Sequence, residues 1–271
     1  MGPSTPWTRA RPSPPVFRVR QRGTTLALSL GVNTRSSVRR RELALHAARL
    51  AASVAILGAA IHDGSVWLAA VASGALFLAA FSFMHDLAHG SLGLPRRANE
   101  LALSFAGLVM LMSGHALRTT HLRHHARPLA ADDVEGAPAC MPLWRALLVG
   151  PAAALALRVS AFRHARSHGR RWQIVETSVG LVIAAALLGS ASWPYVVVAA
   201  VAQMTMGVWA AHVPHNAPPW VVRCARSFAC TGSVTALRLA YHELHHERPG
   251  VPCQVLGLEL ATARSSARPS T

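Results

Sequence analysis

Three clusters of histidines carry the side chain that most often binds transition metals in proteins. The segment "MHDLAH" (84–89) holds two imidazoles four residues apart, which share one face of a helix. The segments "HLRHH" (121–125) and "HELHH" (242–246) each hold three imidazoles at positions i, i+3 and i+4, which also converge on one side of a helix. The candidate metal ligands are therefore His85, His89, His121, His124, His125, His242, His245 and His246.

The last cluster, "YHELHHERPG" (241–250), permits two interpretations. As His-Glu-x-x-His it is a zinc-protease signature, with His242 and His246 as ligands and Glu243 as general base. As His-x-x-His-His it is a three-imidazole cluster that includes His245 and leaves Glu243 incidental. Eight imidazoles exceed the four ligands of a tetrahedral zinc site and suit two ions of five or six coordination. Nitrogen ligands alone do not distinguish iron from copper, nickel or zinc.

The composition of the chain favours a membrane protein. Of the 271 residues, 52% are hydrophobic and 14% are charged, and the mean hydropathy is +0.30. The net charge is +16, and all 27 basic residues are arginines. Because these arginines lie between long apolar runs, they favour contact with anionic lipid over binding to nucleic acid. No C-x-x-C pair occurs among the cysteines, which argues against a disulfide framework or a thiolate metal site (Cys140, Cys224, Cys230 and Cys253).

Four apolar runs are predicted to cross the membrane in two helical hairpins. They are Leu43–Ile61, Val66–Met84, Ile174–Leu188 and Tyr195–Ala211. The first two have 19 residues each, enough to reach across roughly 28 Å of hydrocarbon. The shorter runs Leu101–Met112 and Leu147–Leu157 are predicted to be re-entrant or interfacial helices.

Arginine placement predicts the orientation. The hairpin turns at 62–65 and 189–194 contain no arginine, whereas the opposite ends of the spans are rich in it. The positive-inside rule then places both termini, the long loops and all the histidine clusters on the cytoplasmic side of a bacterial inner membrane. The predicted fold is an all-α, multi-pass membrane bundle with a cytoplasmic histidine-rich cap.

Three segments are predicted along the chain. Residues 1–41 contain no acidic residue and are rich in Arg, Pro, Ser and Thr, which is typical of a disordered basic tail. An organelle transit peptide is the alternative for this tail. Residues 42–256 form the membrane domain, and residues 257–271 form a disordered C-terminal tail.

The order H-x-x-x-H, H-x-x-H-H, H-x-x-H-H, with paired spans between, resembles the membrane fatty-acid desaturase superfamily, which includes membrane hydroxylases and carotenoid ketolases. The resemblance covers about residues 43–255 and extends to "HDLAHGSL", "HHARPLAADD" and "PHN". The pieces "HDLAHGSL" and "PH" are similar to those of carotenoid ketolases. The resemblance implies two iron ions, O2 as oxidant and the eight histidines named above as ligands. His215 is the first choice for a ninth ligand, and His212 is the second.

Carboxylates beside the ligands are candidates for orienting them, because metal-bound imidazoles usually donate their second N–H to a carboxylate or a carbonyl. Asp86 and Glu243 have this predicted role, with an ion pair to a nearby arginine as the alternative. Asn216 is predicted to hold a metal-bound water, although a turn explains it as well. The segment "ADDVEG" (131–136) either orders its loop through arginines or ligand histidines or is a solvated turn. No catalytic residue is predicted beyond the metal ligands.

Isolated histidines are interpreted as structural, namely His46, His62 and His115. The pair in "HARSH" (164–168) has helical spacing, but four surrounding arginines would repel a dication.

The predicted function is O2-dependent, di-iron oxidation of an unactivated C–H bond of a lipid, by fatty-acyl desaturation or hydroxylation. A carotenoid ketolase or hydroxylase is the nearest alternative, followed by an intramembrane zinc protease and a haem-binding electron carrier. The sequence contains no G-x-G-x-x-G loop, no iron–sulfur cysteine spacing and no fused haem domain. Electrons are therefore predicted to come from a separate donor such as a ferredoxin, which the basic face could dock.

Overall fold

The computed structural model describes residues 32–229, 234–251 and 256, and every regular element among them is helical. In chain order the elements are α1 (Val32–His62), α2 (Val66–Ala88), α3 (Arg96–Val109), α4 (Gly114–Ala126), η1 (Ala137–Cys140), α5 (Leu143–Leu148), α6 (Gly150–His164), α7 (Ser167–Leu188), α8 (Trp193–Met204), η2 (Gly207–His212), α9 (Val213–Asn216), α10 (Pro219–Ala229), α11 (Val234–Ala240) and α12 (His242–Glu247). Of these, η1 is a 3-10 helix and η2 is a π-helix.

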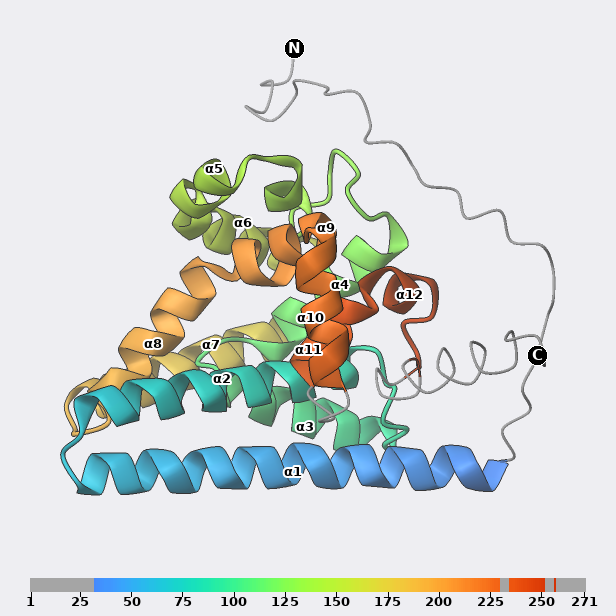
Figure 1. The fold of residues 1–271 in the computed structure, drawn as a ribbon. Coiled ribbons are helices and arrows are strands. Elements are labelled where there is room, and N and C mark those ends of the chain that lie inside the picture. Colours follow the sequence, from blue (N-terminus) through green and yellow to red (C-terminus); the bar gives the residue numbers. More distant parts are fainter. Residues whose placement is uncertain (1–31, 230–233, 252–255, 257–271) are drawn as a thin grey trace, which may run out of the picture.

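Helices α1 and α2 form an antiparallel hairpin that runs along one side of the molecule (Figure 1). The chain reverses at Gly64, whose φ of 67° is readily adopted only by a residue without a side chain. The Ser65 hydroxyl then accepts a hydrogen bond from the backbone N–H of Leu68 and caps α2. Helix α2 lies between α1 and α8, and it buries Phe77 and Met84 completely.

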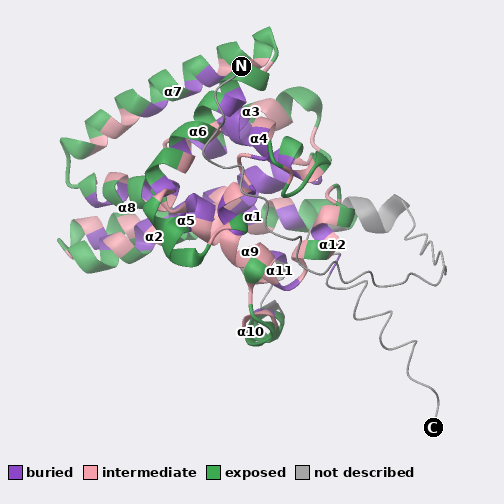
Figure 2. Ribbon diagram, turned by 90° about the horizontal axis from the view of Figure 1, so that it is seen from above, coloured by how far each residue is buried: buried purple, intermediate pink, exposed green. Residues whose placement is uncertain are grey.

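Within the described part of the chain, three helices are long and apolar enough to cross a membrane, and the number rises to five if each of two bent pairs is one span. The three are α2, α7 and the Arg39–His62 part of α1. The bent pairs are α3 with α4, at 104°, and α8 with η2 and α9, at 49°. Buried residues gather where α2, α3 and α4 meet, whereas α7 is exposed along much of its length (Figure 2). The predicted all-α, multi-pass bundle is confirmed.

Helix α1 begins at Val32, inside the stretch predicted to be a disordered tail. The prolines of that stretch all lie between residues 3 and 15, and the last glycine is at residue 31. Nothing after this glycine interrupts a helix, so the arginine-rich segment extends the first span by about two turns. The rest of the predicted tail, and the predicted C-terminal tail at 257–271, lie outside the described residues.

The predicted fourth span is bent rather than straight. Helix α8 ends at Met204, and the chain continues through the π-helical turn η2. The Trp209 indole N–H donates a hydrogen bond to the carbonyl of Ala202 (2.9 Å), which satisfies an acceptor near the bend. A Cβ on Gly207 would lie 2.8 Å from the Pro138 ring, so this turn can approach η1 only without a side chain at that position.

A buried polar network fixes α4 against α3 and α7. Glu176 of α7 accepts hydrogen bonds from the Ser104 and Ser113 hydroxyls and, at 2.6 Å, from the His115 ring. The other nitrogen of His115 lies 2.6 Å from Glu100. The backbones of α3 and α4 approach so closely that a Cβ on Gly114 would collide with the backbone carbonyl of Leu103 in α3. His115 is thus a structural residue, as its isolation in the sequence indicates.

We expect Glu176→Gln to lower the free energy of unfolding by about 2 kcal/mol, because it weakens several hydrogen bonds to a buried charge. Unfolding of the purified protein in mixed micelles would measure this loss. The control is Glu243→Gln, which alters an exposed carboxylate. Equal stability of the two variants would show that the network contributes no net stability.

Candidate metal centre

The first histidine cluster lies where the C-terminal end of α2 meets α4 and α12. It consists of His85, His89, His121, His125 and His245, and one ring nitrogen of each lies within 4.8 Å of one nitrogen of every other. The Nε2 atoms of His89 and His121 are 3.0 Å apart. Helices far apart in the sequence therefore bring five imidazoles to one point.

The second histidine cluster adjoins the first and consists of His124, His215, His242 and His246. The Nε2 atom of His215 lies 3.3 Å from that of His124 and 3.1 Å from that of His242. The Nε2 atoms of His242 and His246 are 3.2 Å apart. The clusters touch, since the rings of His125 and His246 stack at 4.2 Å.

Helices α4 and α12 each supply histidines to both clusters, which explains the paired histidines of their sequences. On α4, His121 and His125 are one turn apart and face the first cluster, while the intervening His124 faces the second. On α12 the outer two histidines face the second cluster and His245 faces the first. Neighbouring helical residues point about 100° apart, so an adjacent histidine pair can serve two centres and cannot serve one.

The nitrogen spacing suits metal ions. A metal–nitrogen bond of about 2.1 Å places neighbouring ligand atoms of one ion roughly 3.0–3.4 Å apart in octahedral or tetrahedral geometry. The four Nε2–Nε2 distances of 3.0 to 3.3 Å fall in this range. Both ring nitrogens of His125 and of His245 are buried and have no hydrogen-bond partner among the described residues. A bound ion would satisfy such nitrogens.

The imidazoles of α12 have the protonation state that metal binding requires. Burial, reinforced by neighbouring imidazoles, lowers the pKa of His242 to about 2 and that of His246 to about 3. Both rings are therefore neutral at physiological pH, and their lone pairs are free to coordinate.

Two carboxylates of the 131–136 loop form hydrogen bonds with rings of the histidine clusters. Asp133 accepts a 2.6 Å hydrogen bond from Nδ1 of His124, and Glu135 accepts one of the same length from Nδ1 of His121. Asp133 also accepts the backbone N–H groups of Leu129 and Gly136. Burial alone would raise the pKa of Asp133, but these hydrogen bonds outweigh it and lower the pKa. Of the two interpretations of this loop, contact with ligand histidines is the one that the geometry favours.

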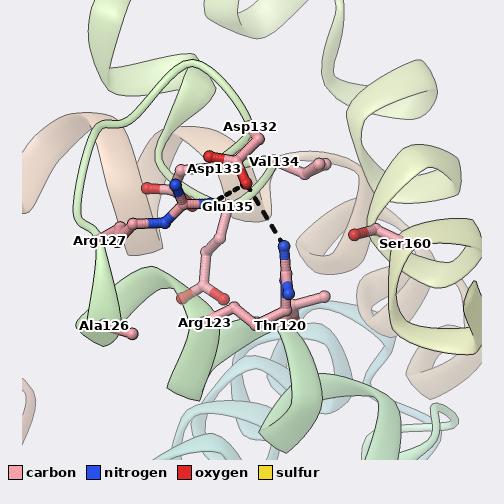
Figure 3. Close-up of a pocket in the computed structure, with 9 residues that line it drawn as sticks. All are labelled: Thr120, Arg123, Ala126, Arg127, Asp132, Asp133, Val134, Glu135 and Ser160. Atoms are coloured by element: carbon pink, nitrogen blue, oxygen red, sulfur yellow. Dashed lines mark hydrogen bonds and ion pairs between the residues drawn. The ribbon is translucent and has the colours of Figure 1, made fainter. Parts of the chain in front are cut away.

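The outer side of the same loop lines a small polar pocket of about 70 Å³ (Figure 3). Asp132 forms ion pairs there with Arg123 and Arg127, and all three side chains are substantially exposed. Adjacent aspartates thus differ in role, because Asp132 faces solvent and Asp133 contacts the second histidine cluster.

Asp86 joins the metal centre to α1 and α11. Its carboxylate lies 2.9 Å from Nε2 of His46, 3.0 Å from the Arg238 guanidinium and 3.4 Å from Nδ1 of His85. In the sequence His46 stands apart from other histidines, and no local pattern singles out Arg238. The available signal was the helical spacing of Glu42, His46 and a third polar residue, Arg49, along an otherwise apolar span.

Some predicted residues lie outside both clusters. His212 contacts the carbonyl of Pro138 at 3.0 Å, so His215 is the histidine of "HVPHN" that joins a cluster. The side-chain amide nitrogen of Asn216 donates hydrogen bonds to the carbonyls of Ala139 and His212. Glu243 is exposed, and no histidine of the described chain donates a hydrogen bond to it.

A cavity of about 620 Å³ opens beside both clusters. Its polar end is formed by His85, His121, His242 and His245, and most of its remaining wall is apolar. This wall comes from α2, α8 and η2 and includes Trp209. A hydrocarbon lodged in it would meet ligands of both clusters.

A multi-pass helical bundle with clustered imidazoles at the end of an apolar cavity defines a class of membrane oxidoreductases. The family model for fatty acid desaturases matches residues 64–265, and the chain belongs to this family. No curated protein and no solved structure matches the chain. This match confirms the resemblance that the histidine segments indicate. Membership of the family implies that the protein is an integral membrane oxidoreductase that acts on lipids.

We expect Asp133→Asn to weaken metal binding by roughly ten- to a hundredfold, because it removes the charge that orients His124. Metal affinity of the purified chain, measured by competition with a chelator, would report the loss. Asp132→Asn is the matched control, since it alters the neighbouring carboxylate on the solvent side. If both variants bind metal equally well, Asp133 does not orient the ligand.

Proposed function

We propose that the protein is a di-iron oxidoreductase that uses O2 to oxidise an unactivated C–H bond of a lipid, by fatty-acyl desaturation or hydroxylation. The observation that carries the proposal is that nine imidazoles form two adjoining clusters facing one apolar cavity. Membership of the fatty acid desaturase family supports it independently. The proposed iron ligands are the five histidines of the first cluster and the four histidines of the second cluster.

Iron suits this donor set. Imidazole nitrogens bind iron, and five of them in the first histidine cluster exceed the four of a tetrahedral zinc site. When bound, iron supplies the oxidising power toward an aliphatic C–H bond that side chains lack. The chain itself holds the ligand rings in place through Asp86, Asp133 and Glu135, and the apolar wall keeps water from the substrate.

Electrons from outside the chain complete the reaction. In desaturation O2 accepts two electrons from the substrate and two from a donor and is reduced to two waters. We propose a separate acidic carrier such as a ferredoxin as that donor. Exposed arginines around the histidine-bearing end, including Arg96, Arg97, Arg123 and Arg127, offer it a complementary surface.

The proposed orientation places this end of the bundle in the cytoplasm. The α1–α2 and α7–α8 turns lie together at the opposite end of the molecule (Figures 1 and 2). Neither turn contains an arginine, so the positive-inside rule supports an outward position for both.

The geometry does not favour a zinc protease. That function requires Glu243 to act as a general base beside His242 and His246, but its side chain is exposed. It also leaves His245 without a role, whereas this residue belongs to the five-imidazole cluster. A haem carrier, which needs imidazoles in opposed pairs, fits neither cluster.

Lipid analysis tests the substrate class. We expect cells that make β-carotene and express this chain to accumulate unsaturated or hydroxylated acyl chains, which cells expressing the His124→Ala variant lack. New keto-carotenoids or hydroxy-carotenoids with unchanged acyl chains would instead identify a carotenoid oxygenase.

We expect His245→Ala to abolish the oxidation, because it removes a ligand from the first histidine cluster. His62→Ala, at the exposed last residue of α1, is the control that should leave activity intact. Gas chromatography of lipids from the two strains, matched for protein content, would compare them. Full activity of His245→Ala would contradict the ligand assignment and favour the protease interpretation.

A further inference from the structure

The apolar cavity extends along α2 away from the metal centre. It is lined by His85 at one end and by Gly74 at the other, eleven residues earlier on the same helix. At 1.5 Å per residue this separation is about 16 Å. On the facing helix, lining residues run from Thr205 back to Val197. The cavity therefore reaches from the histidine-bearing end deep into the membrane-spanning part of the bundle.

Among the described residues that line the cavity, the polar ones lie near the metal-centre end. The far part is lined by Leu78, Val197, Val198 and Val201, with Gly74 at its limit. Leu78, Val197 and Val201 are also exposed on the surface of the bundle, which faces lipid. Nothing in this part could bind a carboxylate, phosphate or sugar, so it suits the hydrocarbon tail of a substrate.

Among the described residues, Gly74 is the glycine that lines the far part, and space remains around it. A Cβ added there would meet no atom within 4 Å. Its φ is not in the left-handed region, so a larger side chain is compatible with the helix. Such a side chain would occupy the end of the cavity without displacing its neighbours.

We propose that Gly74 is a specificity-determining residue: it sets the length of hydrocarbon that fits beyond the reacting carbon. This proposal rests on the proposed function, since it takes the cavity as the substrate site. The substrate then lies along α2, with the reacting carbon beside His85 and His245 and its tail pointing toward the α1–α2 turn. A side chain at position 74 shortens the space for that tail and leaves the metal centre unchanged.

The test compares Gly74→Phe with Gly58→Phe in cells supplied with saturated acids from dodecanoate to octadecanoate. Gly58 is a matched control, because it lies on the neighbouring span, is equally open to a Cβ and does not line the cavity. We expect Gly74→Phe to lower oxidation of the longest chain roughly tenfold relative to the shortest. Gly58→Phe should keep the chain-length profile of the unaltered protein. A profile that is the same for both variants would overturn the proposal.

A second measurement does not require activity. Octadecanoate with a diazirine on its terminal carbon is irradiated with the purified protein, and the attachment sites are mapped by mass spectrometry. We expect attachment to α2 near Gly74 and Leu78 and to α8 near Val197, and its loss in Gly74→Phe. Attachment elsewhere would overturn the proposal. If the probe attaches near Gly74 but the protein oxidises no lipid, the proposed function is wrong and the assigned binding site is correct.

Discussion

The structure depends on holding nine imidazoles together in a buried site. Nε2 atoms lie 3.0 to 3.3 Å apart in both clusters, and the ring nitrogens of His125 and His245 have no hydrogen-bond partner among the described residues. Such an arrangement would be costly to bury unless cations lay between the rings. Neutral rings are a precondition for metal binding, and burial favours the neutral form of His242 and His246 by lowering their pKa. Burial also increases the free-energy penalty of a ring that is turned away from its partners. This penalty accounts for the carboxylates that contact the Nδ1 atoms of His85, His121 and His124.

The helical framework is arranged around this constraint. Helix α4 carries ligands for both clusters, and the Glu176 network and the glycine contact with α3 fix its position. Helix α2 carries His85 in its last turn and His89 as its C-cap. Asp86, which lies between them, connects this end of α2 to α1 and α11. The bend after α8 lets the bent pair of α8 with η2 and α9 both line the apolar cavity and bring His215 to the second cluster.

Local patterns in the sequence predicted the helical spans and the nine histidines, because helical spacing and apolar length do not depend on distant contacts. Long-range partners could not be predicted in this way. Asp86 meets His46 and Arg238 from 40 and 152 residues away. Its position next to a histidine favoured Glu243 as a carboxylate that orients a ring. The rings of His124 and His121 are instead contacted by Asp133 and Glu135, because their loop folds back over α4. The bends beside α3 and α8 likewise depend on packing between helices.

The central claim is that the two histidine clusters hold two iron ions. The most direct test is elemental analysis of the full-length protein, purified from iron-replete cells in a mild detergent, with iron and zinc counted per chain. The account predicts two irons per chain and no stoichiometric zinc. A single zinc per chain, without iron, would contradict it.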